Sequence, residues 1–278
     1  MNKKLLLSIV VAVIAAGGIW TQASGLSGKK NAADPAESVP SQSQPEPSAP
    51  PEDAHVIASL PDRTIENRDG GLAVVTNASS TLVLANKKRN LPSDYEPVDL
   101  VVPNVDFSFS GDAPKKQLRQ EAATALEALF AKAKEDGIDL KAVSGYRSYA
   151  TQRSLFAYYA DKHGEEEATR FSARAGQSEH QTGLAMDVSS ASVGYGLEES
   201  YGETTEGKWL VAHAADHGFI LRYPKGKEEI TGYQYEPWHI RFVGTDVAKR
   251  IMDEGTTLEE FFDSVAVEVA RFESAATE

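Results

Sequence analysis

Two histidines and two carboxylates stand in two short segments of the chain, and together they could bind a metal ion and activate water. His180 and Asp187 are seven residues apart, with Gly183 between them, and Glu236 stands three residues before His239. Two imidazoles and one carboxylate are a sufficient protein shell for a catalytic zinc ion, which keeps its fourth position for water. The remaining glutamate could take a proton from that water if it lies within hydrogen-bond reach. The chain has no cysteine, so any zinc must be held by N and O donors.

We predict that His180, Asp187 and His239 bind one zinc ion and that Glu236 is the general base. Taken singly, a histidine is more often a hydrogen-bonded structural residue than a ligand, because imidazole has many roles. Glu236 alone could likewise be a solvated carboxylate in a loop. Two distant segments that each supply metal-type donors favour the metal site. Pro237 also fixes the backbone beside Glu236 at a φ near about −65°.

A second pair of histidines has the spacing of a metal site but lacks part of its signature. His213 and His217 stand four residues apart in a predicted helix, which places two imidazoles on one face. A His-Glu-x-x-His zinc site needs a glutamate after the first histidine, and here that residue is Ala214. We therefore interpret His213 and His217 as packing or surface residues. His163 and His55 have no nearby set of ligands in the sequence.

The two segments carry a recognisable order of residues. Ser-x-His-x-x-Gly-x-x-x-Asp runs from Ser178 to Asp187, and Glu-x-x-His runs from Glu236 to His239. In this order they resemble the zinc D-alanyl-D-alanine carboxypeptidases of the VanY type, which include related L,D-carboxypeptidases. The segment 144–148, Ser-Gly-Tyr-Arg-Ser, is similar to the substrate-binding segment of that family.

The resemblance covers about residues 81–262 and implies a zinc-dependent carboxypeptidase that acts on peptidoglycan stem peptides. It places Arg147, Gln152 and Ser178 around the carboxylate of the terminal D-alanine. Arg147 offers a planar fork that matches a carboxylate with two hydrogen bonds, which a lysine cannot imitate. We therefore predict Arg147 and Glu236 as catalytic residues, and Arg147 joins Gln152 and Ser178 as substrate-binding residues. The alternative for Gln152 is a residue on the surface of a helix.

The expected function has two alternatives. The bond that is cut could be D,D or L,D, which depends on the shape of a pocket that the residue types do not determine. The domain could instead be a zinc-containing module that binds the cell wall without turnover. Glu236 favours the enzyme, since a module without turnover needs no general base.

Composition and charge narrow the class of protein and its partners. The net charge of −13 argues against the basic footprint that nucleic-acid binding requires, so we expect no nucleic-acid partner. The chain of 278 residues is long enough for one globular domain with appendages. We expect peptidoglycan stem peptides as its partners and a monomer as its state.

The first 53 residues are expected to be non-globular. Lys3 and Lys4 precede an apolar run at 5–20, so residues 1–24 are predicted to be a signal peptide or an uncleaved membrane anchor. Residues 25–53 are rich in Pro, Ser, Gln and Glu, which predicts a disordered linker. The protein is therefore expected outside the cytoplasm, secreted or anchored. Its only contact with the membrane would be this N-terminal segment.

The helices and strands predicted around the site residues do not follow a repeating βαβ order. Residues 54–80 are predicted as an uncertain lead-in with a short strand at 72–75, and residues 81–278 as the zinc carboxypeptidase domain. An apolar run predicts a strand at 81–85, and three- and four-residue spacing of apolar residues predicts a helix at 115–136.

Further strands are predicted at 140–144, 184–188, 219–222 and 238–243, and further helices at 149–162, 165–172, 208–217 and 245–254. Thr257 and Glu260 form a capping-box pattern that predicts one last helix. This order favours an α+β fold with a small antiparallel sheet flanked by helices. The resemblance implies the same zinc carboxypeptidase fold, of the Hedgehog/DD-peptidase-like kind.

Overall fold

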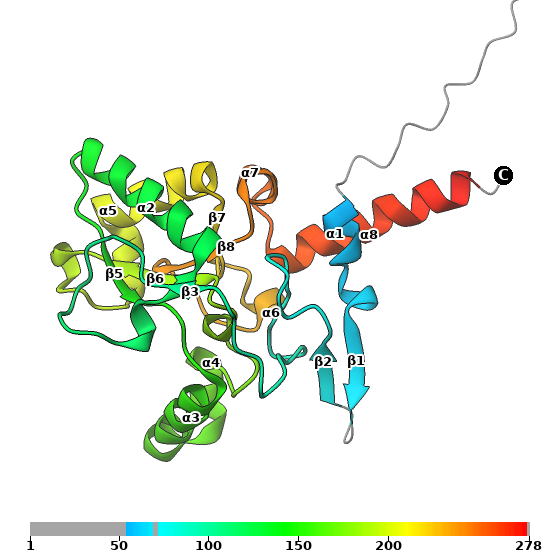
Figure 1. Ribbon diagram of the computed structural model, residues 1–278, viewed down its shortest axis with the longest axis horizontal. Helices are drawn as coiled ribbons and strands as arrows, with labels where there is room; N and C mark the ends of the chain where they lie inside the picture. The colour runs from blue at the N-terminus through cyan, green and yellow to red at the C-terminus, as the bar shows by residue number, and fades with distance from the viewer. Residues whose placement is uncertain (1–53, 69–71, 277–278) are drawn as a thin grey trace, which may run out of the picture. The chain divides into compact units, whose positions relative to one another are not determined.

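The computed structural model describes residues 54–68 and 72–276 (Figure 1). The predicted export segment at 1–24 and the predicted linker at 25–53 lie outside the described residues. No helix within the described ranges is both long and apolar enough to cross a membrane.

A four-stranded antiparallel sheet lies at the centre of the fold, and its strands follow the order β5-β6-β8-β7. The predicted α+β fold with a small antiparallel sheet is confirmed, and the four strands agree with the predicted ones to within two residues. Their bounds are Lys141–Ser144 for β5, Ala185–Ser189 for β6, Phe219–Leu221 for β7 and His239–Phe242 for β8.

Side chains along the two central strands, β6 and β8, point alternately toward the hydrophobic core and toward the site. Met186 of β6 pairs with Ile240 of β8, and both side chains belong to the hydrophobic core that includes the buried residues of α2 (Gln120–Glu135). Successive side chains of a strand point to opposite faces, so Asp187 and His239 lie on the other face of the sheet. The apolar pattern of β6 and β8 therefore fixes which face carries the polar residues.

Helices flank the sheet in separate groups (Figure 1). The α3 and α4 helices pack against each other and lie away from α2 and α5. In α3, the side chain of Ser148 caps the first turn by accepting from the backbone N–H of Thr151, and Gln152 is its one buried residue. The bounds are Gln120–Glu135 for α2, Tyr149–His163 for α3, Glu165–Phe171 for α4, Thr205–His213 for α5, Glu228–Thr231 for α6 and Thr245–Glu254 for α7.

The α2 helix begins at Gln120, five residues later than its predicted start. A 3-10 helix, Pro114–Lys116, occupies the first of these residues. The short strand β4 (Leu118–Arg119) then pairs with β3 (Leu100–Val101). Leu118 fitted the apolar spacing of the predicted helix, but it belongs to β4. It is buried in the same hydrophobic core as the residues of α2, so its burial alone did not distinguish a strand from a helix.

The apolar segment at 81–85 is not a strand, which corrects the prediction for these residues. Its carbonyl oxygens are satisfied by buried arginine side chains in place of a neighbouring strand. Arg241 donates to the carbonyls of Thr81 and Val83 at 2.9 and 2.8 Å. Arg89 donates to a third carbonyl of the segment at 3.1 Å. The apolar pattern of residues 81–85 could not show that arginine side chains would supply the hydrogen bonds that a neighbouring strand usually provides.

A second hydrophobic core lies where the lead-in meets the C-terminal helix. The α1 helix (Ala54–Ala58) lies beside α8 (Leu258–Ala275), and both contribute buried residues to this core (Figure 1). The hairpin of β1 (Ile65–Arg68) and β2 (Leu72–Val75) follows α1, so the strand predicted at 72–75 is confirmed. The capping box of Thr257 and Glu260 opens α8, as predicted.

Arg89 joins the lead-in to the remainder of the domain. Its side chain is 7% exposed and donates to the carbonyls of Pro61 and Thr64 at 2.9 and 3.1 Å, in addition to Leu84 at 3.1 Å. It also donates to the hydroxyl of Thr64 at 3.0 Å. A single guanidinium thus satisfies four buried or half-buried oxygens from two separate segments.

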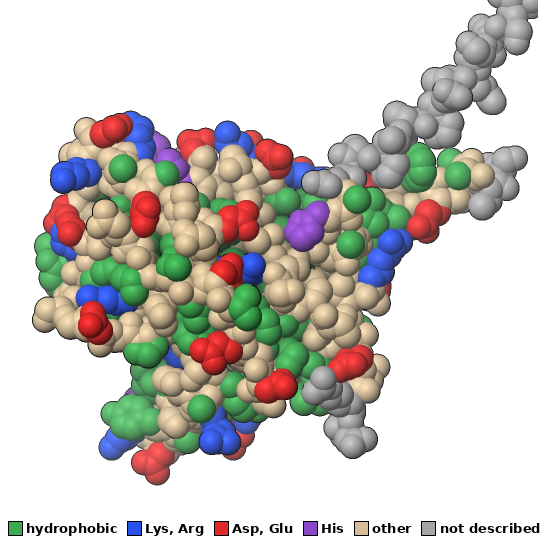
Figure 2. Space-filling model, viewed as in Figure 1, with side chains coloured by type: hydrophobic (Ala, Val, Ile, Leu, Met, Phe, Trp, Pro, Cys, Tyr) green, Lys and Arg blue, Asp and Glu red, His purple; other side chains and the backbone are tan. Residues whose placement is uncertain are grey.

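The surface carries both signs of charge. On the face that Figure 2 shows, acidic and basic side chains are interspersed, and apolar side chains lie between them.

We expect Arg89→Ala to lower the free energy of unfolding by about 2–4 kcal/mol, because it leaves several buried carbonyls without a donor. Arg63→Ala is the matched control, since Arg63 pairs with Glu273 at 3.3 Å while both side chains are largely exposed. That change should cost less than about 1 kcal/mol. Urea unfolding followed by circular dichroism measures both. Equal losses for the two variants would contradict the role of Arg89.

Candidate active site

The register of β6 and β8 places Asp187 directly opposite His239. Opposed residues on one face of an antiparallel pair have neighbouring Cβ atoms, so their side chains meet. The Nδ1 atom of His239 lies 3.1 Å from Oδ1 of Asp187, and both residues are buried. The pairing of the two strands therefore suffices to bring the carboxylate and one imidazole together.

His180 reaches the same place from a 3-10 helix, Glu179–Thr182, which ends at Gly183 in a left-handed conformation with φ 67°. A side chain at Gly183 would be strained there and would also meet Leu100 and Arg119. The chain then turns straight into β6, so His180 lies close to Asp187. The Nε2 atom of His180 is 3.5 Å from Oδ2 of Asp187.

The other ring nitrogen of His180 fixes the orientation of that imidazole. Nδ1 lies 2.8 Å from the carbonyl oxygen of Gly145, and because a carbonyl only accepts, Nδ1 carries the proton. Gly145 is held by its own N–H, which donates to the carbonyl of Lys115 at 2.7 Å. A Cβ atom at this position would lie 2.5 Å from the carbonyl oxygen of Gln117, so only glycine fits. The Nε2 lone pair of His180 is therefore free to bind a metal.

The three predicted ligands form a group that fits a metal ion. One donor atom from each of His180, Asp187 and His239 lies within 4.8 Å of the others, and all three residues are buried. Oδ1 of Asp187 is buried and forms no hydrogen bond, although Nδ1 of His239 lies 3.1 Å away. Such an oxygen beside two imidazoles suits a zinc site with nitrogen and oxygen donors.

The electrostatics of the group favour a cation. Burial lowers the pKa of His180 to about 3, so its ring is neutral. Burial alone would also lower the pKa of His239, but the carboxylates of Asp187 and Glu179 outweigh burial and raise that pKa to about 9. In the absence of metal, a proton on His239 therefore supplies positive charge among these carboxylates, and a metal ion can replace it.

Glu236 lies at the edge of the same group. Its backbone N–H donates to the carbonyl of Tyr223 at 3.1 Å, and its own carbonyl accepts from the N–H of His239 at 3.1 Å. Its Oε2 lies 3.7 Å from Nδ1 of His239. Burial raises the pKa of Glu236 to about 7, although the positive charges of His239 and Arg147 oppose the rise. This carboxyl group can therefore both take up and release a proton near neutral pH.

Arg147 presents a half-buried guanidinium whose hydrogen-bond partners are uncharged. Its Nη1 donates to Oε1 of Gln152 at 2.8 Å, and its Nη2 donates to the hydroxyl of Ser144 at 3.1 Å. Within the described ranges, no carboxylate lies at ion-pair distance from Arg147. Burial lowers the pKa of Arg147. A half-buried positive charge that lines a cleft is suited to binding an anionic group from outside.

Gln152 is 1% exposed, which excludes the alternative of a surface residue on its helix. Its amide N–H donates to the carbonyl of Ala173 at 2.6 Å, so its oxygen faces Arg147. Ser178 is also buried and lines the same cleft. The structure therefore brings the predicted substrate-binding residues to the predicted metal ligands.

These residues line one open cleft of about 290 Å³. Its polar floor contains Arg147, Ser178, Asp187 and Glu236, besides the two histidines of the metal group. Its walls are largely aromatic and come from α3, α4 and the segment before β8: Tyr159, Phe171, Tyr223, Tyr233 and Trp238.

The other histidines lie elsewhere. His213 stacks on Trp209 with ring centroids 4.2 Å apart, and its Nδ1 is 2.8 Å from the carbonyl oxygen of Trp209. His163 packs edge-on against Phe171. Among the described residues, His180, Asp187 and His239 form the only group that could hold a metal ion, so His213 and His217 do not form a second one.

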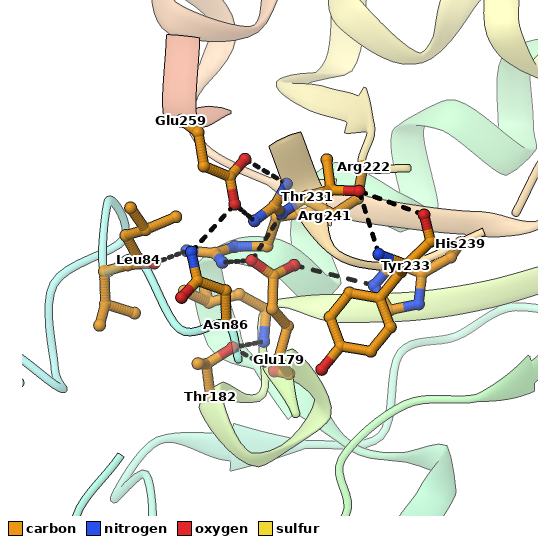
Figure 3. Close-up of polar contacts among 12 residues, drawn as sticks. Leu84, Asn86, Glu179, Thr182, Arg222, Thr231, Tyr233, His239, Arg241 and Glu259 are labelled. Atoms are coloured by element: carbon orange, nitrogen blue, oxygen red, sulfur yellow. Dashed lines mark hydrogen bonds and ion pairs between the residues drawn. The ribbon is translucent and has the colours of Figure 1, made fainter. Parts of the chain in front are cut away.

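A buried ionic cluster that the sequence did not predict lies directly behind His239 (Figure 3). Glu179 accepts from Arg222 at 2.8 Å and from Arg241 at 2.7 Å, and all three side chains are fully buried. Burial alone would raise the pKa of Glu179, but the two guanidinium groups hold it well below its usual range. The sequence does contain one signal, because Arg241 stands inside an apolar strand, where an unpaired charge is rarely buried.

The chain is similar to known carboxypeptidases in both sequence and fold. The family model described as VanY, D-alanyl-D-alanine carboxypeptidase, matches residues 115–245. YodJ of Bacillus subtilis (strain 168) is 51% identical over 195 residues, which cover 70% of this chain and 71% of that protein.

Two solved structures are similar as well. The LD-carboxypeptidase LdcB is 50% identical, with a TM-score of 0.69, and the match covers 72% of this chain and 92% of that one. The vancomycin-resistance D,D-pentapeptidase VanY of the VanB-type cassette was solved as a Glu-to-Ala mutant in complex with Zn(II). It is 32% identical, with a TM-score of 0.54 and coverage of 65% and 98%. From the motifs, the fold and these matches together, the chain belongs to the VanY family of D-alanyl-D-alanine carboxypeptidases.

Proposed function

We propose that the protein is an extracytoplasmic zinc carboxypeptidase that removes the C-terminal D-alanine from peptidoglycan stem peptides. The observation that carries this proposal is one cleft that contains a buried metal-type group, a carboxyl group beside it and a half-buried guanidinium with no ion-pair partner among the described residues. The location outside the cytoplasm follows from the substrate, because peptidoglycan lies there.

The ligands of the zinc ion would be Nε2 of His180, the carboxylate of Asp187 and Nδ1 of His239. The structure supports this choice because the remaining nitrogen of His180 is committed to the carbonyl of Gly145. When bound, zinc lowers the pKa of water and polarises a carbonyl group. Three protein ligands leave room for that chemistry, as in other catalytic zinc sites.

Glu236 would be the general base. Its carboxylate lies beside the metal group and lines the cleft, where it could contact a water that attacks the scissile carbonyl. It would accept the proton of that water and return it to the leaving amine as the C–N bond breaks. A carboxyl group placed beside both the water and the leaving amine can perform both transfers.

Arg147 would bind the carboxylate of the terminal D-alanine, with Gln152 and Ser178 beside it. Gln152 holds the guanidinium in place from the protein side, and the absence of an acidic partner for Arg147 within the described residues leaves it available to the substrate. An enzyme that removes one C-terminal residue needs such an anchor, because it fixes the distance from the terminus to the scissile bond.

We favour an L,D bond over a D,D bond, because the likeness to LdcB is greater than the likeness to the D,D-pentapeptidase. In a tetrapeptide stem this bond joins the third residue, which has the L configuration, to D-alanine. The wall-binding alternative is less favoured because the buried Glu236 beside the ligands has no purpose in a module without turnover.

Substrate identity is tested with synthetic stem peptides and mass spectrometry. We expect the tetrapeptide to lose one D-alanine faster than the pentapeptide does, and C-terminal amides to resist cleavage. Preferred cleavage of the pentapeptide would instead support D,D specificity. Equal cleavage of acids and amides would contradict a carboxypeptidase, and binding without turnover would favour the wall-binding module.

In the same assay, Arg147→Lys should lower kcat/KM by about 10- to 1,000-fold, since lysine keeps the charge but loses the two-pronged hydrogen bond. Arg153→Lys is the matched control, because Arg153 is an exposed arginine on α3, six residues after Arg147 in the chain. It should leave kcat/KM at the wild-type value. A similar loss in both variants would contradict the role of Arg147.

The metal assignment predicts that His180→Ala and His239→Ala lose zinc, whereas His213→Ala retains it. The wild-type protein should contain about one zinc ion per chain, which elemental analysis after dialysis measures. Full zinc content in both of the first two variants would show that other residues bind the metal.

The base assignment predicts that Glu236→Gln lowers kcat by about 10²–10⁴ while zinc content and substrate affinity stay near wild type. Glutamine keeps the size of the side chain but cannot take the proton. Glu229→Gln, an exposed change in the preceding segment, should have no effect on kcat. Loss of zinc from Glu236→Gln would make Glu236 a ligand, and unchanged turnover would remove it from the mechanism.

A further inference from the structure

Glu179 lies directly beside the predicted metal group but has no part in the chemistry proposed above. It precedes His180 in the chain, and its carboxylate extends to the far side of the His239 ring (Figure 3). Its Oε1 accepts from Nε of Arg222 at 2.8 Å and from Nη1 of Arg241 at 2.7 Å. Two guanidinium donors therefore occupy one oxygen of Glu179 and leave the other for a different partner.

Both arginines also form hydrogen bonds with groups other than Glu179. Nη1 and Nη2 of Arg222 form a two-pronged pair with Glu259 at 2.8 and 2.7 Å. Arg241 uses its remaining donors on backbone carbonyls, including those of Thr81 and Val83. The two glutamates and two arginines balance in charge, and neither arginine can turn away from Glu179 without losing other hydrogen bonds.

The second oxygen of Glu179 faces His239. Oε2 of Glu179 and Nε2 of His239 are 3.7 Å apart, slightly beyond hydrogen-bond distance. Both atoms are buried, and neither has any other hydrogen-bond partner. A buried donor and a buried acceptor that face each other with no other partner need only a small rotation of the imidazole to pair.

We propose that Glu179 is a positioning residue for the metal site, which accepts the Nε2 proton of His239 and so leaves Nδ1 as the atom that binds zinc. A carboxylate between two guanidinium groups stays ionised and can only accept. A neutral imidazole has one N–H, so a proton held on Nε2 leaves the lone pair on Nδ1, the nitrogen that lies 3.1 Å from Asp187. A carboxylate behind a histidine ligand fixes the tautomer and strengthens zinc binding.

This inference rests on the proposed ligand role of His239, and Glu179→Gln tests it. Glutamine is nearly isosteric, but its oxygen must face the two arginines, so its NH2 group would face Nε2 of His239. That donor favours the tautomer with the proton on Nδ1, which cannot bind zinc. We expect zinc affinity of the folded protein, measured by competition with a chromophoric chelator, to fall about 10- to 100-fold. The visible spectrum of the Co(II)-substituted protein should change as well.

Glu259→Gln is the control for a purely structural effect. It disturbs the same ionic cluster from the α8 side but does not touch His239, so it should lower the thermal midpoint and leave zinc affinity and the Co(II) spectrum near wild type. Wild-type zinc affinity and an unchanged Co(II) spectrum in Glu179→Gln would overturn the inference. If His239→Ala loses zinc in that case, the ligand assignment survives and only the positioning role fails.

A measurement on the zinc-loaded wild type keeps the inference testable if Glu179→Gln does not fold. Long-range ¹H–¹⁵N correlation spectra distinguish the two tautomers of a histidine ring. We expect His239 to carry its proton on Nε2. A proton on Nδ1 of His239 would overturn the inference without any variant.

Discussion

The charge balance around Glu179 is the constraint on which the site depends. Glu179, Arg222 and Arg241 are buried together, and each would be an uncompensated charge without the others. Removing one partner of such a group typically costs about 3–5 kcal/mol, because the remaining charge stays buried. The main effect of the cluster is therefore to favour one arrangement of these three side chains. Its net contribution to the free energy of unfolding is smaller than the cost of breaking it.

That arrangement joins segments that are distant in the sequence. Glu179 belongs to the short helix that carries His180, and Arg241 stands two residues after His239 on the same face of β8. Arg222 reaches Glu259 at the start of α8, and Arg241 satisfies the irregular segment at 81–85. One ionic cluster thus connects four parts of the chain. They are the short helix with His180, the strand with His239, the C-terminal helix α8 and the segment at 81–85.

The parts of the fold that depend on local pattern could be predicted from the sequence. The four strands of the central sheet and the capping box of α8 follow from apolar runs and from Thr257 with Glu260. The late start of α2 and the absence of a strand at 81–85 could not be predicted. The first depends on pairing with β3, and the second depends on the buried side chains of Arg89 and Arg241, which take the place of a neighbouring strand.

The site shows the same division. Residue types and spacing identified the group of His180, Asp187 and His239, since zinc chemistry restricts the donors that can serve. Spacing could not show that Gln152 is buried, because its helix has no apolar face to set its orientation. Glu179 stood inside the motif but had no distinguishing type, and its partners Arg222 and Arg241 are recognisable only once the strands pair.

The zinc ligands can be identified by anomalous diffraction at the zinc edge from crystals of the zinc-loaded protein. We expect one strong peak, bounded by Nε2 of His180, the carboxylate of Asp187 and Nδ1 of His239, with Nε2 of His239 within hydrogen-bond distance of Glu179. A peak held by other residues, or by His239 through Nε2, would contradict this assignment.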